Sequence, residues 1–385
     1  MRIIYFGTFS KGEGYPRYGV ILGGLKSVGV EISECHFPFW RGTSEKEKGV
    51  TNFWVGLKIA YRFFWAWLVL TFRYLFQSES HDLILVGYPG HLDVFLAKFL
   101  GSIKKKPVVL DAFISLYEAV VEDRALLNSS SFLARLLKKL DVWSARMADL
   151  VLLDTEAHIE YYRKELGIDK VDFLRVFVGG EENHFHPISV ERKISSDIKV
   201  LFFGGFLPLH GVDVIVKTID LLSYREDLSF TFVGDGPEWE RCYREWSFIS
   251  GKVRVEWIKR WVSYSELRDK IEEADICLGI FGGNGKALRV IPCKVFNILA
   301  MRKPLITADT PAVREAIVHR QDAILVEPNN PEALADAIVE LASDAEFRRK
   351  LADRGYLTYM EKFSMKAIGE NLLMELERRF DKWQL

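Results

Sequence analysis

Residues 198–236 read IKVLFFGGFLPLHGVDVIVKTIDLLSYREDLSFTFVGDG and contain one complete strand–helix–strand unit. Residues 198–205 are apolar and end in two glycines, and residues 212–222 have apolar side chains at helical spacing. Residues 228–236 return to a strand pattern that ends in Gly-Asp-Gly. This order is typical of a parallel sheet, so the stretch predicts an α/β domain.

The same alternation extends along the chain in both directions. Further strand-like runs occupy residues 2–7, 30–37, 82–89, 107–113, 149–155, 253–258, 275–281, 303–309 and 323–328. The polar segment 181–197 interrupts the pattern and is interpreted as a linker. We therefore expect two doubly wound parallel-sheet domains, 1–185 and 186–363, followed by a separate C-terminal segment, 364–385. Ligands in such sheets bind beyond the carboxyl ends of the strands, so the two domains are expected to face a central cleft.

The composition indicates a globular protein of a reducing compartment. The chain has 385 residues, 49% of them hydrophobic and 27% charged, and its net charge of −1 gives no reason to expect nucleic-acid binding. Its cysteines, Cys35, Cys242, Cys277 and Cys293, are far apart and form no CxxC pair. We therefore expect no disulfide framework and no metal site. The opening MRIIYFGTFS is strand-like rather than a secretion signal, so a cytoplasmic location is expected.

One apolar and aromatic stretch has two interpretations. Residues 52–77 read NFWVGLKIAYRFFWAWLVLTFRYLFQ, and their longest uncharged run, 63–72, is about half of the ~20 residues that a spanning helix needs. Lys58, Arg62 and Arg73 interrupt the apolar pattern. The stretch is either a helix that packs on the sheet or a helix that lies in a membrane interface. The second interpretation predicts a peripheral protein of the cytoplasmic membrane face.

Two loops of the second domain are candidates for nucleotide contacts. In GGFLPLHGVD (204–213), the backbone N–H groups and the following helix can receive a phosphate, and Gly205 and Gly211 permit close approach. His210 is placed to donate to a phosphate oxygen, although the loop also fits an ordinary turn. In WIKRWVSYSEL, Trp261 either stacks on a base or packs in the core.

The loop GGNGKALRVIPCKVFN, within residues 279–307, is the strongest anion-site candidate. Glycines and three cationic side chains converge on the start of a helix, which favours binding of a negative group. A surface basic loop is the alternative. The candidate donor-binding residues here are Gly283, Lys286, Arg289, Lys294 and Asn297. The last of these is placed to accept from a ribose hydroxyl.

The first domain supplies the acceptor-side candidates. The loop GTFSKGEGYPRYG follows the first strand, and Lys11, Gly12 and Arg17 are its candidate ligands for an acceptor or a phosphate. His91 and Asp111 follow other strands of this domain and are the candidate catalytic residues. A histidine at the end of a strand is also a common structural residue.

Several segments together resemble the family 4 retaining glycosyltransferases of the GT-B fold. They are GGFLPLHGVDVIV with FTFVGDGPE, WVSYSELRDKIEEADICLGIF, IPCKVFNILAMRKPLITADTPAVRE with ILVEPNNPEALADAI, and, in the first half, DLVLLDTEAH and VFVGGEENHFHP. The resemblance covers nearly the whole chain. It implies two Rossmann-like domains, metal-independent transfer from a nucleoside diphosphate sugar with retention, and a last helix that packs back on the first domain. It implies no further cofactor.

The chain departs from the family pattern at its best-known positions. Phe206 and His210 stand where family members commonly carry an arginine and a lysine that bind diphosphate. Arg289 and Asn297 stand where the two glutamates of the Glu-x7-Glu motif would fall, whereas Lys294 matches a lysine of one branch. We therefore interpret the chain as a divergent member with a donor site rebuilt around cationic groups.

Three functions remain open on the sequence. The first is a glycosyltransferase with a glycan or lipid-linked, membrane-proximal acceptor, favoured by residues 52–77 and by the basic runs Lys104–Lys106 and Lys138–Lys139. The second is a nucleotide-sugar epimerase, which shares this architecture and needs no acceptor. The third is a non-catalytic nucleotide-binding protein, favoured by the missing glutamates.

Overall fold

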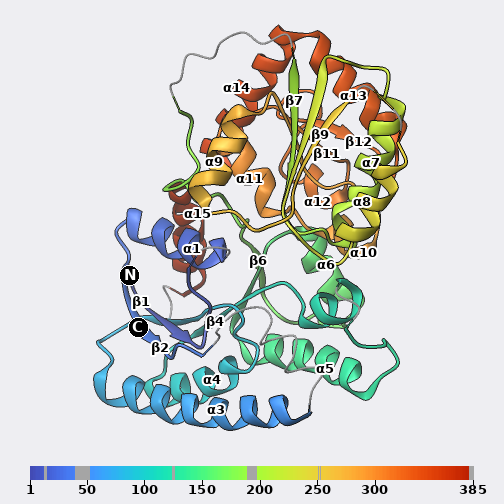
Figure 1. Ribbon diagram of the computed structural model, residues 1–385. Helices are drawn as coiled ribbons and strands as arrows, with labels where there is room; N and C mark the ends of the chain where they lie inside the picture. The colour runs from blue at the N-terminus through green and yellow to red at the C-terminus, as the bar shows by residue number, and fades with distance from the viewer. Residues whose placement is uncertain are drawn as a thin grey trace. The chain divides into compact units, whose positions relative to one another are not determined.

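The structure, a computed structural model, shows the chain as two compact units (Figure 1). It describes residues 1–12, 15–39, 53–123, 126–188, 197–249, 251 and 253–380. One unit comprises Met1–Phe177 with Met365–Leu385, and the other comprises Val178–Ser364. The chain thus first passes between the units at residue 177, whereas the sequence placed this boundary at residue 185. Residues 189–196 of the expected linker lie outside the described residues.

The first unit contains a six-stranded sheet of order β2-β1-β3-β4-β5-β6 in which every pairing is parallel. Its strands are β1 (Arg2–Gly7), β2 (Glu31–His36), β3 (Leu83–Val86), β4 (Val108–Phe113), β5 (Leu150–Leu153) and β6 (Phe173–Arg175). The strand order reverses between β1 and β3, so the loops after these strands diverge there. Such a switch point is where open α/β sheets bind ligands.

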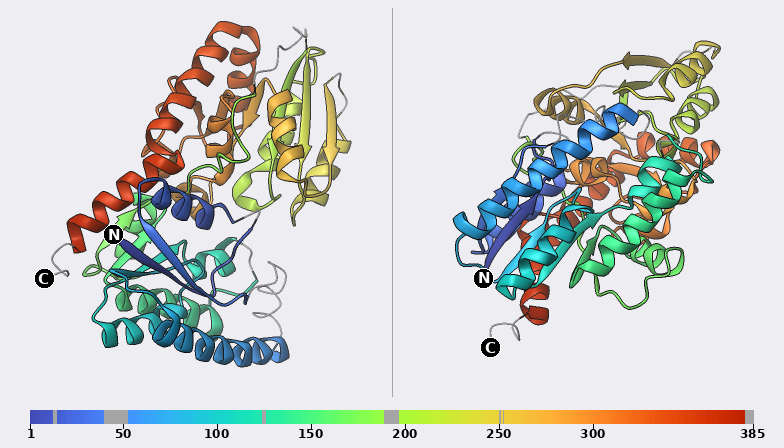
Figure 2. Two further views of the ribbon diagram at one scale, coloured as in Figure 1. Left: turned by 90° about the vertical axis from the view of Figure 1, so that its left-hand side faces the viewer. Right: turned by 90° about the horizontal axis from the view of Figure 1, so that it is seen from below.

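Helices cover both faces of this sheet (Figure 2). The helices described here are α1 (Pro16–Ser27), α3 (Phe53–Phe72), α4 (Asp93–Lys104), α5 (Phe132–Met147), α6 (Glu156–Lys164) and α15 (Met365–Phe380), with π-helical turns at Arg73–Gln77 and Glu118–Asp123. Alternate residues of β1 enter different cores: Ile4 packs with α3, α4 and α6, and Ile3 packs with α1 and α15. Strand residues alternate in direction, which explains the two cores.

The C-terminal helix is fastened to the first unit by close backbone packing. A Cβ atom added at Gly24 of α1 would lie 2.3 Å from the backbone oxygen of Met365. A Cβ atom at Gly369 of α15 would lie 2.2 Å from the backbone of Gly24. Glycine at both positions therefore allows α1 and α15 to approach, and α15 completes the core on that face of the sheet.

The second unit repeats the architecture, with a parallel sheet of order β12-β11-β10-β7-β8-β9. Its strands are β7 (Ile198–Phe203), β8 (Leu228–Val233), β9 (Arg254–Ile258), β10 (Ile276–Leu278), β11 (Leu305–Ala308) and β12 (Ile324–Val326). Its helices are α7 (Val212–Leu221), α8 (Trp239–Ser247), α9 (Tyr264–Glu273), α10 (Gly285–Arg289), α11 (Cys293–Ala300), α12 (Pro311–Arg314), α13 (Pro331–Ser343) and α14 (Ala345–Lys362), with a 3-10 turn at Pro208–His210. The prediction of two doubly wound parallel sheets is confirmed.

One predicted helix is divided in the structure. The pattern of residues 331–355 by itself predicts one continuous helix, but α13 ends at Ser343 and α14 begins at Ala345. The side chain of Asp344 accepts a hydrogen bond from the backbone N–H of Phe347, at 2.8 Å, and so starts the second helix. An aspartate inside a helical pattern is therefore a helix start here.

Candidate functional site

The strongest candidate site lies at the carboxyl end of β7, beside the switch point between β7 and β10. Gly204 follows the strand with φ +128°, and Gly234 follows β8 with φ +136°. A Cβ atom at Gly234 would lie 2.0 Å from the backbone oxygen of Gly204. The two turns therefore touch backbone to backbone, which only glycine permits. Gly211 is left-handed, with φ +61°, and is the N-cap residue of α7.

Lys294, on the first turn of α11, extends into this glycine turn. Its side chain is 6% exposed, and its Nζ atom has no hydrogen-bond partner among the described residues. The Nζ atom lies 3.9 Å from the centre of the Phe202 ring and would be 3.1 Å from a Cβ atom at Gly204. Burial lowers the pKa of Lys294 well below its ordinary value. A buried amine without a counter-ion, next to a glycine turn, is an unsatisfied site for an anion.

His210 is the second group that meets this turn. Its Nδ1–H donates to the backbone oxygen of Gly205, which leaves Nε2 as the acceptor of the neutral ring. Burial lowers the pKa of His210 well below its ordinary value, and the charges of Lys294 and Lys286 lower it further. The neutral ring of His210 therefore has no proton on Nε2 to donate to a phosphate oxygen. The predicted contact with a phosphate forms only when Nε2 takes up a proton.

The neighbouring loop and α10 bring the other predicted donor-site residues to the same unit. Lys286 is 8% exposed, and its charge acts on His210, which places it near the glycine turn. Arg289 folds back along its own helix, where its guanidinium would be 3.1 Å from a Cβ atom at Gly285. Asn297 lies one turn after Lys294 on α11 and is 9% exposed.

Gly283 packs closely against a neighbouring side chain, and the two tryptophans of the loop WIKRWVSYSEL differ in their surroundings. A Cβ atom at Gly283 would lie 2.3 Å from Nδ2 of Asn329, so a larger residue there would displace the amide end of that side chain. Trp257 stacks on Phe232, with ring centres 4.1 Å apart and an interplanar angle of 6°, and is a packing residue. Trp261 is 69% exposed, which leaves its ring available for stacking on a base.

Phe206 belongs to the core rather than to the binding turn. It is 0% exposed and packs among the aromatic rings of Phe202, Phe232 and Trp257. A buried phenyl ring cannot replace the cationic side chain that the family resemblance places here. Any diphosphate contact in this unit therefore depends on Lys294 and its neighbours.

In the first unit, two predicted site residues bind each other. The Arg17 guanidinium donates to the Asp111 carboxylate through Nε, at 3.0 and 3.2 Å, and through Nη2, at 2.8 Å. Their side chains are 4% and 0% exposed. Arg17 also donates to the backbone oxygens of Val176 and Phe177. The predictions of Arg17 as a phosphate ligand and Asp111 as a catalytic group are therefore corrected: the two form a buried structural ion pair.

The other two candidates of the first unit, Lys11 and Gly12, lie in the loop after β1. Lys11 pairs with Glu34 and lies 5.2 Å from the centre of the Phe9 ring, so its charge is already compensated within its own unit. Gly12 has φ +102° and nothing within 4 Å of an added Cβ atom, so its backbone conformation, not crowding, favours glycine. The next residues of this loop, 13 and 14, lie outside the described residues.

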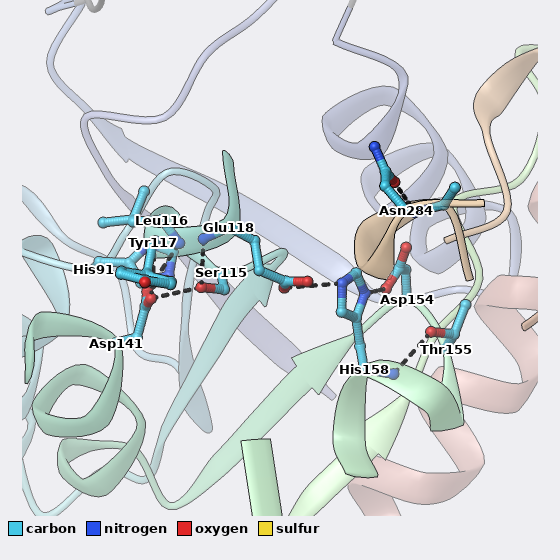
Figure 3. A network of polar contacts seen from close by, with 11 residues as sticks. His91, Ser115, Leu116, Tyr117, Glu118, Asp141, Asp154, Thr155, His158 and Asn284 are labelled. Atoms are coloured by element: carbon cyan, nitrogen blue, oxygen red, sulfur yellow. Dashed lines mark hydrogen bonds and ion pairs between the residues drawn. The ribbon is translucent and has the colours of Figure 1, made fainter. Parts of the chain in front are cut away.

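His91, the other catalytic candidate, is buried in a polar network at the carboxyl ends of β3, β4 and β5 (Figure 3). Its Nε2 atom lies 3.4 Å from Asp141, and burial lowers the pKa of its ring. The Asp141 carboxylate accepts hydrogen bonds from the Ser115 hydroxyl at 2.6 Å and from the backbone N–H groups of Leu116 and Tyr117 at 2.9 and 3.0 Å. His91 is 1% exposed, and neither of its ring nitrogens has a hydrogen-bond partner among the described residues, so its catalytic role stays a prediction.

The second half of the network is a buried charge cluster that the sequence reasoning missed. His158 lies between Asp154, which it contacts through Nδ1, and Glu118, whose Oε2 is 3.1 Å from Nε2 (Figure 3). Burial by itself would lower the pKa of His158, but the two carboxylates outweigh it and raise the pKa to about 10. The ring is therefore a fixed cation that ties the loop after β4 to α6. The signal for one pair was present in the sequence, since Asp154 directly follows β5 and His158 lies four residues later, on α6.

Within the described ranges, no group of three or more His, Cys, Asp or Glu side chains is placed to hold a metal ion. The four cysteines, all of which lie among the described residues, form no disulfide, and three of them are buried. The chemistry of the candidate site therefore rests on lysine, histidine, amide and backbone groups.

Comparison with known proteins assigns the unit that carries the candidate site. Residues 197–344 match the family model of the glycosyl transferases group 1. The second unit contains a glycosyl transferases group 1 domain. An uncharacterized glycosyltransferase of Methanocaldococcus jannaschii is 23% identical over 182 residues, which are 47% of each chain. The alpha-D-kanosaminyltransferase of Streptomyces kanamyceticus is 28% identical over 185 residues, 45% of this chain and 44% of the relative. The matched region thus spans about half the length of these relatives.

Solved structures establish the fold of the whole chain. Anabaena HepE in complex with UDP has a TM-score of 0.69 at 13% identity and covers 98% of this chain and 100% of its own. Sucrose-phosphate synthase from Thermosynechococcus elongatus has a TM-score of 0.69 at 14% identity and covers 99% of both chains. The GT-B fold predicted from the sequence is confirmed.

Proposed function

We propose that the chain is a metal-independent, retaining glycosyltransferase that moves a hexosyl group from a nucleoside diphosphate sugar to an acceptor. The observation that carries the proposal is the buried, unpartnered Lys294 amine beside Gly204 at the carboxyl end of β7. Burying a charge without a partner is costly, so a bound diphosphate is the group that would make this arrangement favourable. That the matched domain is of the group 1 type supports the same assignment.

The other residues of the second unit have complementary roles in this proposal. The backbone N–H groups of the Gly204–Gly205 turn and the Lys286 side chain add positive potential around the diphosphate. Asn297 accepts from a ribose hydroxyl, and the exposed Trp261 ring stacks on the base. The structures of HepE in complex with UDP and with UDP-glucose make uridine diphosphate the first ligand to test.

The proposed chemistry needs positive charge at the leaving group more than it needs a protein base. The bond between the anomeric carbon and the diphosphate oxygen breaks, and a bond to the acceptor oxygen forms on the same face of the sugar. The acceptor proton passes to the departing diphosphate oxygen. Lys294 stabilises the negative charge that develops there, which is a transition-state effect. Asp111 is buried in its ion pair with Arg17, and His91 is 1% exposed, which agrees with a reaction that uses neither.

For the acceptor we propose a glycan, lipid-linked or otherwise close to a membrane, and for the protein a cytoplasmic, peripheral location. The support is the exposed apolar side of α3 and the turn after it, which includes Trp54, Phe64 and Phe76. An acceptor carried by a lipid would be presented at the surface to which such a helix binds.

The experiment is a titration with the diphosphates of uridine, guanosine, adenosine and cytidine, followed by product analysis with the matching sugar conjugates. A ligand present at a hundred times its dissociation constant adds about 2.7 kcal/mol of stability, which a thermal-shift screen detects. Sugar transferred to an added acceptor supports the proposal, and an isomerised sugar formed from donor alone supports an epimerase instead.

The non-catalytic alternative is favoured by one observation, the presence of Arg289 and Asn297 where two motif glutamates are expected. Tight diphosphate binding with neither transfer nor hydrolysis on any acceptor would establish it. The absence of binding to every diphosphate would overturn both the enzymatic and the non-catalytic proposals.

A further inference from the structure

We infer that the outer surface of α3, α4 and α5 is a docking face for an anionic lipid bilayer. The inference concerns a surface of the first unit and does not rest on the sugar-transfer proposal. These three helices lie side by side on one face of the sheet, with α4 between α3 and α5 (Figure 2). We call their outer surface the three-helix face.

The three-helix face is apolar and aromatic to a degree that no other part of the described chain matches. More than half of the exposed large hydrophobic side chains among the described residues lie on these helices. On α3 and the turn after it they are Trp54, Leu57, Tyr61, Phe64, Trp65, Leu68, Phe72 and Phe76. On α4 and α5 they are Phe99, Ile103, Phe132, Leu133, Leu136, Trp143 and Met147. A contiguous patch of this kind marks an interaction surface.

The charges of the three-helix face are all of one sign. The carboxylates of the three helices and the turn after α3 are Asp93 and Asp141, and both are 0% exposed. The exposed charged side chains of the face and of the residue after α4 are Lys58, Arg73, Lys105, Arg135, Lys138, Lys139 and Arg146. None of these seven forms an ion pair with another described residue. Since the whole chain has a net charge of −1, the positive charge is local to this surface.

Three exposed arginines of the second unit are paired with carboxylates, in contrast to the seven basic residues of the three-helix face. On the second unit, the partly or fully exposed Arg260, Arg314 and Arg320 each pair with a carboxylate, at 2.5 to 2.6 Å. The seven basic residues named above have no such partner in the described chain, whereas Lys98 of α4 pairs with Asp149. Exposed aromatic rings beside uncompensated lysines and arginines match the headgroup region of an anionic bilayer, where rings enter the interface and cations meet lipid phosphates.

In this inference, α3 lies on the surface of the bilayer rather than crossing it. Trp54–Gln77 is long and apolar enough to span a membrane by length and composition. However, Ala66, Leu70 and Tyr74 are 0% exposed, and the last two belong to the core of the first unit. Trp67 also donates to Asp93 of α4 at 3.2 Å. To span a bilayer, α3 would have to leave this core, whereas docking on the surface buries only the side that is already exposed.

The test is co-sedimentation of the full chain with vesicles of phosphatidylcholine, with and without phosphatidylglycerol, at low and high salt. We expect binding to the anionic vesicles that weakens with salt. Lys138→Glu with Lys139→Glu removes two favourable contacts of about 1 kcal/mol each, so binding should fall by about 30-fold or more. The matched control is Lys366→Glu with Arg378→Glu, two charge reversals on α15, on the other face of the sheet; it should bind as the unaltered chain does.

A second pair of variants separates the apolar contribution. Phe64→Ser with Trp65→Ser should weaken binding by about tenfold or more, because two half-exposed rings lose their insertion into the interface. Phe248→Ser with Tyr224→Ser, at exposed positions of the second unit, is the control.

Two results would overturn the inference. One is that the unaltered chain does not bind anionic vesicles, or that it and all the variants bind them equally well. The other is a dimer in sedimentation velocity that the Phe64→Ser, Trp65→Ser variant dissociates, since a second copy of the chain would then cover the face. Diphosphate affinity, measured in parallel, should be the same in every one of these variants, so failure here is distinguishable from failure of the proposed function.

Discussion

The replacement Lys294→Met tests the donor site because it should change ligand affinity and stability in opposite directions. Methionine has nearly the shape of lysine but no charge. A charge-assisted hydrogen bond to a phosphate is worth about 1.5–3 kcal/mol, so the affinity for the diphosphate should fall by about tenfold to 150-fold. The buried position of the Nζ atom, against the Phe202 ring and the Gly204 turn, leaves little water to compensate for the loss.

The same variant should be more stable than the original chain without ligand. An unpaired buried polar group costs about 1–3 kcal/mol, and methionine removes that cost. In a domain of about 150–250 residues this corresponds to a rise of about 2–12 °C in Tm. Most replacements in a core lower Tm, so a rise identifies a residue that is kept for binding rather than for folding.

The assay is isothermal titration calorimetry with the diphosphate found in the ligand screen, together with thermal unfolding of the free protein. Because burial lowers the pKa of Lys294, binding of an anion should restore the charged form and take up a proton. The measured enthalpy should then vary with the ionisation enthalpy of the buffer, and affinity should fall as pH rises. Lys217→Met, at an exposed position of α7, is the matched control and should change neither quantity.

The assignment of Lys294 would be refuted if Lys294→Met bound the diphosphate as tightly as the original chain. A lower Tm together with unchanged affinity would identify Lys294 as a packing residue of the second unit.

Three further predictions concern groups that the structure places in the interior. Arg17→Leu leaves the Asp111 carboxylate buried without its partner and should cost about 3–5 kcal/mol in urea unfolding, while unchanged stability would contradict a structural ion pair. His158 has a folded pKa of about 10, above its unfolded value of about 6.5. Its stabilisation is therefore complete below pH ~6.5 and should decline by about 1.4 kcal/mol per pH unit up to pH ~10; a profile that is flat in the original chain and in Glu118→Gln alike would argue against a fixed cation. Gly234→Ala places a Cβ atom 2.0 Å from a backbone oxygen at φ +136°, so it should destabilise the second unit by more than the roughly 1–3 kcal/mol of backbone strain alone; near-original urea stability would show that the two turns separate easily.

The outcome for individual residues shows which kind of inference the sequence supports. Lys294, the second residue of α11, was chosen as a donor-site candidate from glycine, charge and helix signals that all lie within one local segment. Asp111 and Arg17 were misassigned because they are 94 residues apart in the chain and their pairing depends on how β4 and α1 pack. Glu118 and His158 were missed for the same reason, since a charge cluster from two loops leaves no local spacing to recognise.

The sequence by itself determined the alternation of buried strands and amphipathic helices, because period and turn chemistry are local properties of neighbouring residues. It therefore predicted both parallel sheets and the glycine turns at the ends of their strands. The tertiary structure alone decided which polar groups face one another, which carboxylates are neutralised, and which buried lysine has no hydrogen-bond partner among the described residues. It also decided that the outward surfaces of three helices combine into one basic, aromatic face. Burial and pairing depend on distances between segments that are remote in the chain, and no local pattern specifies those distances.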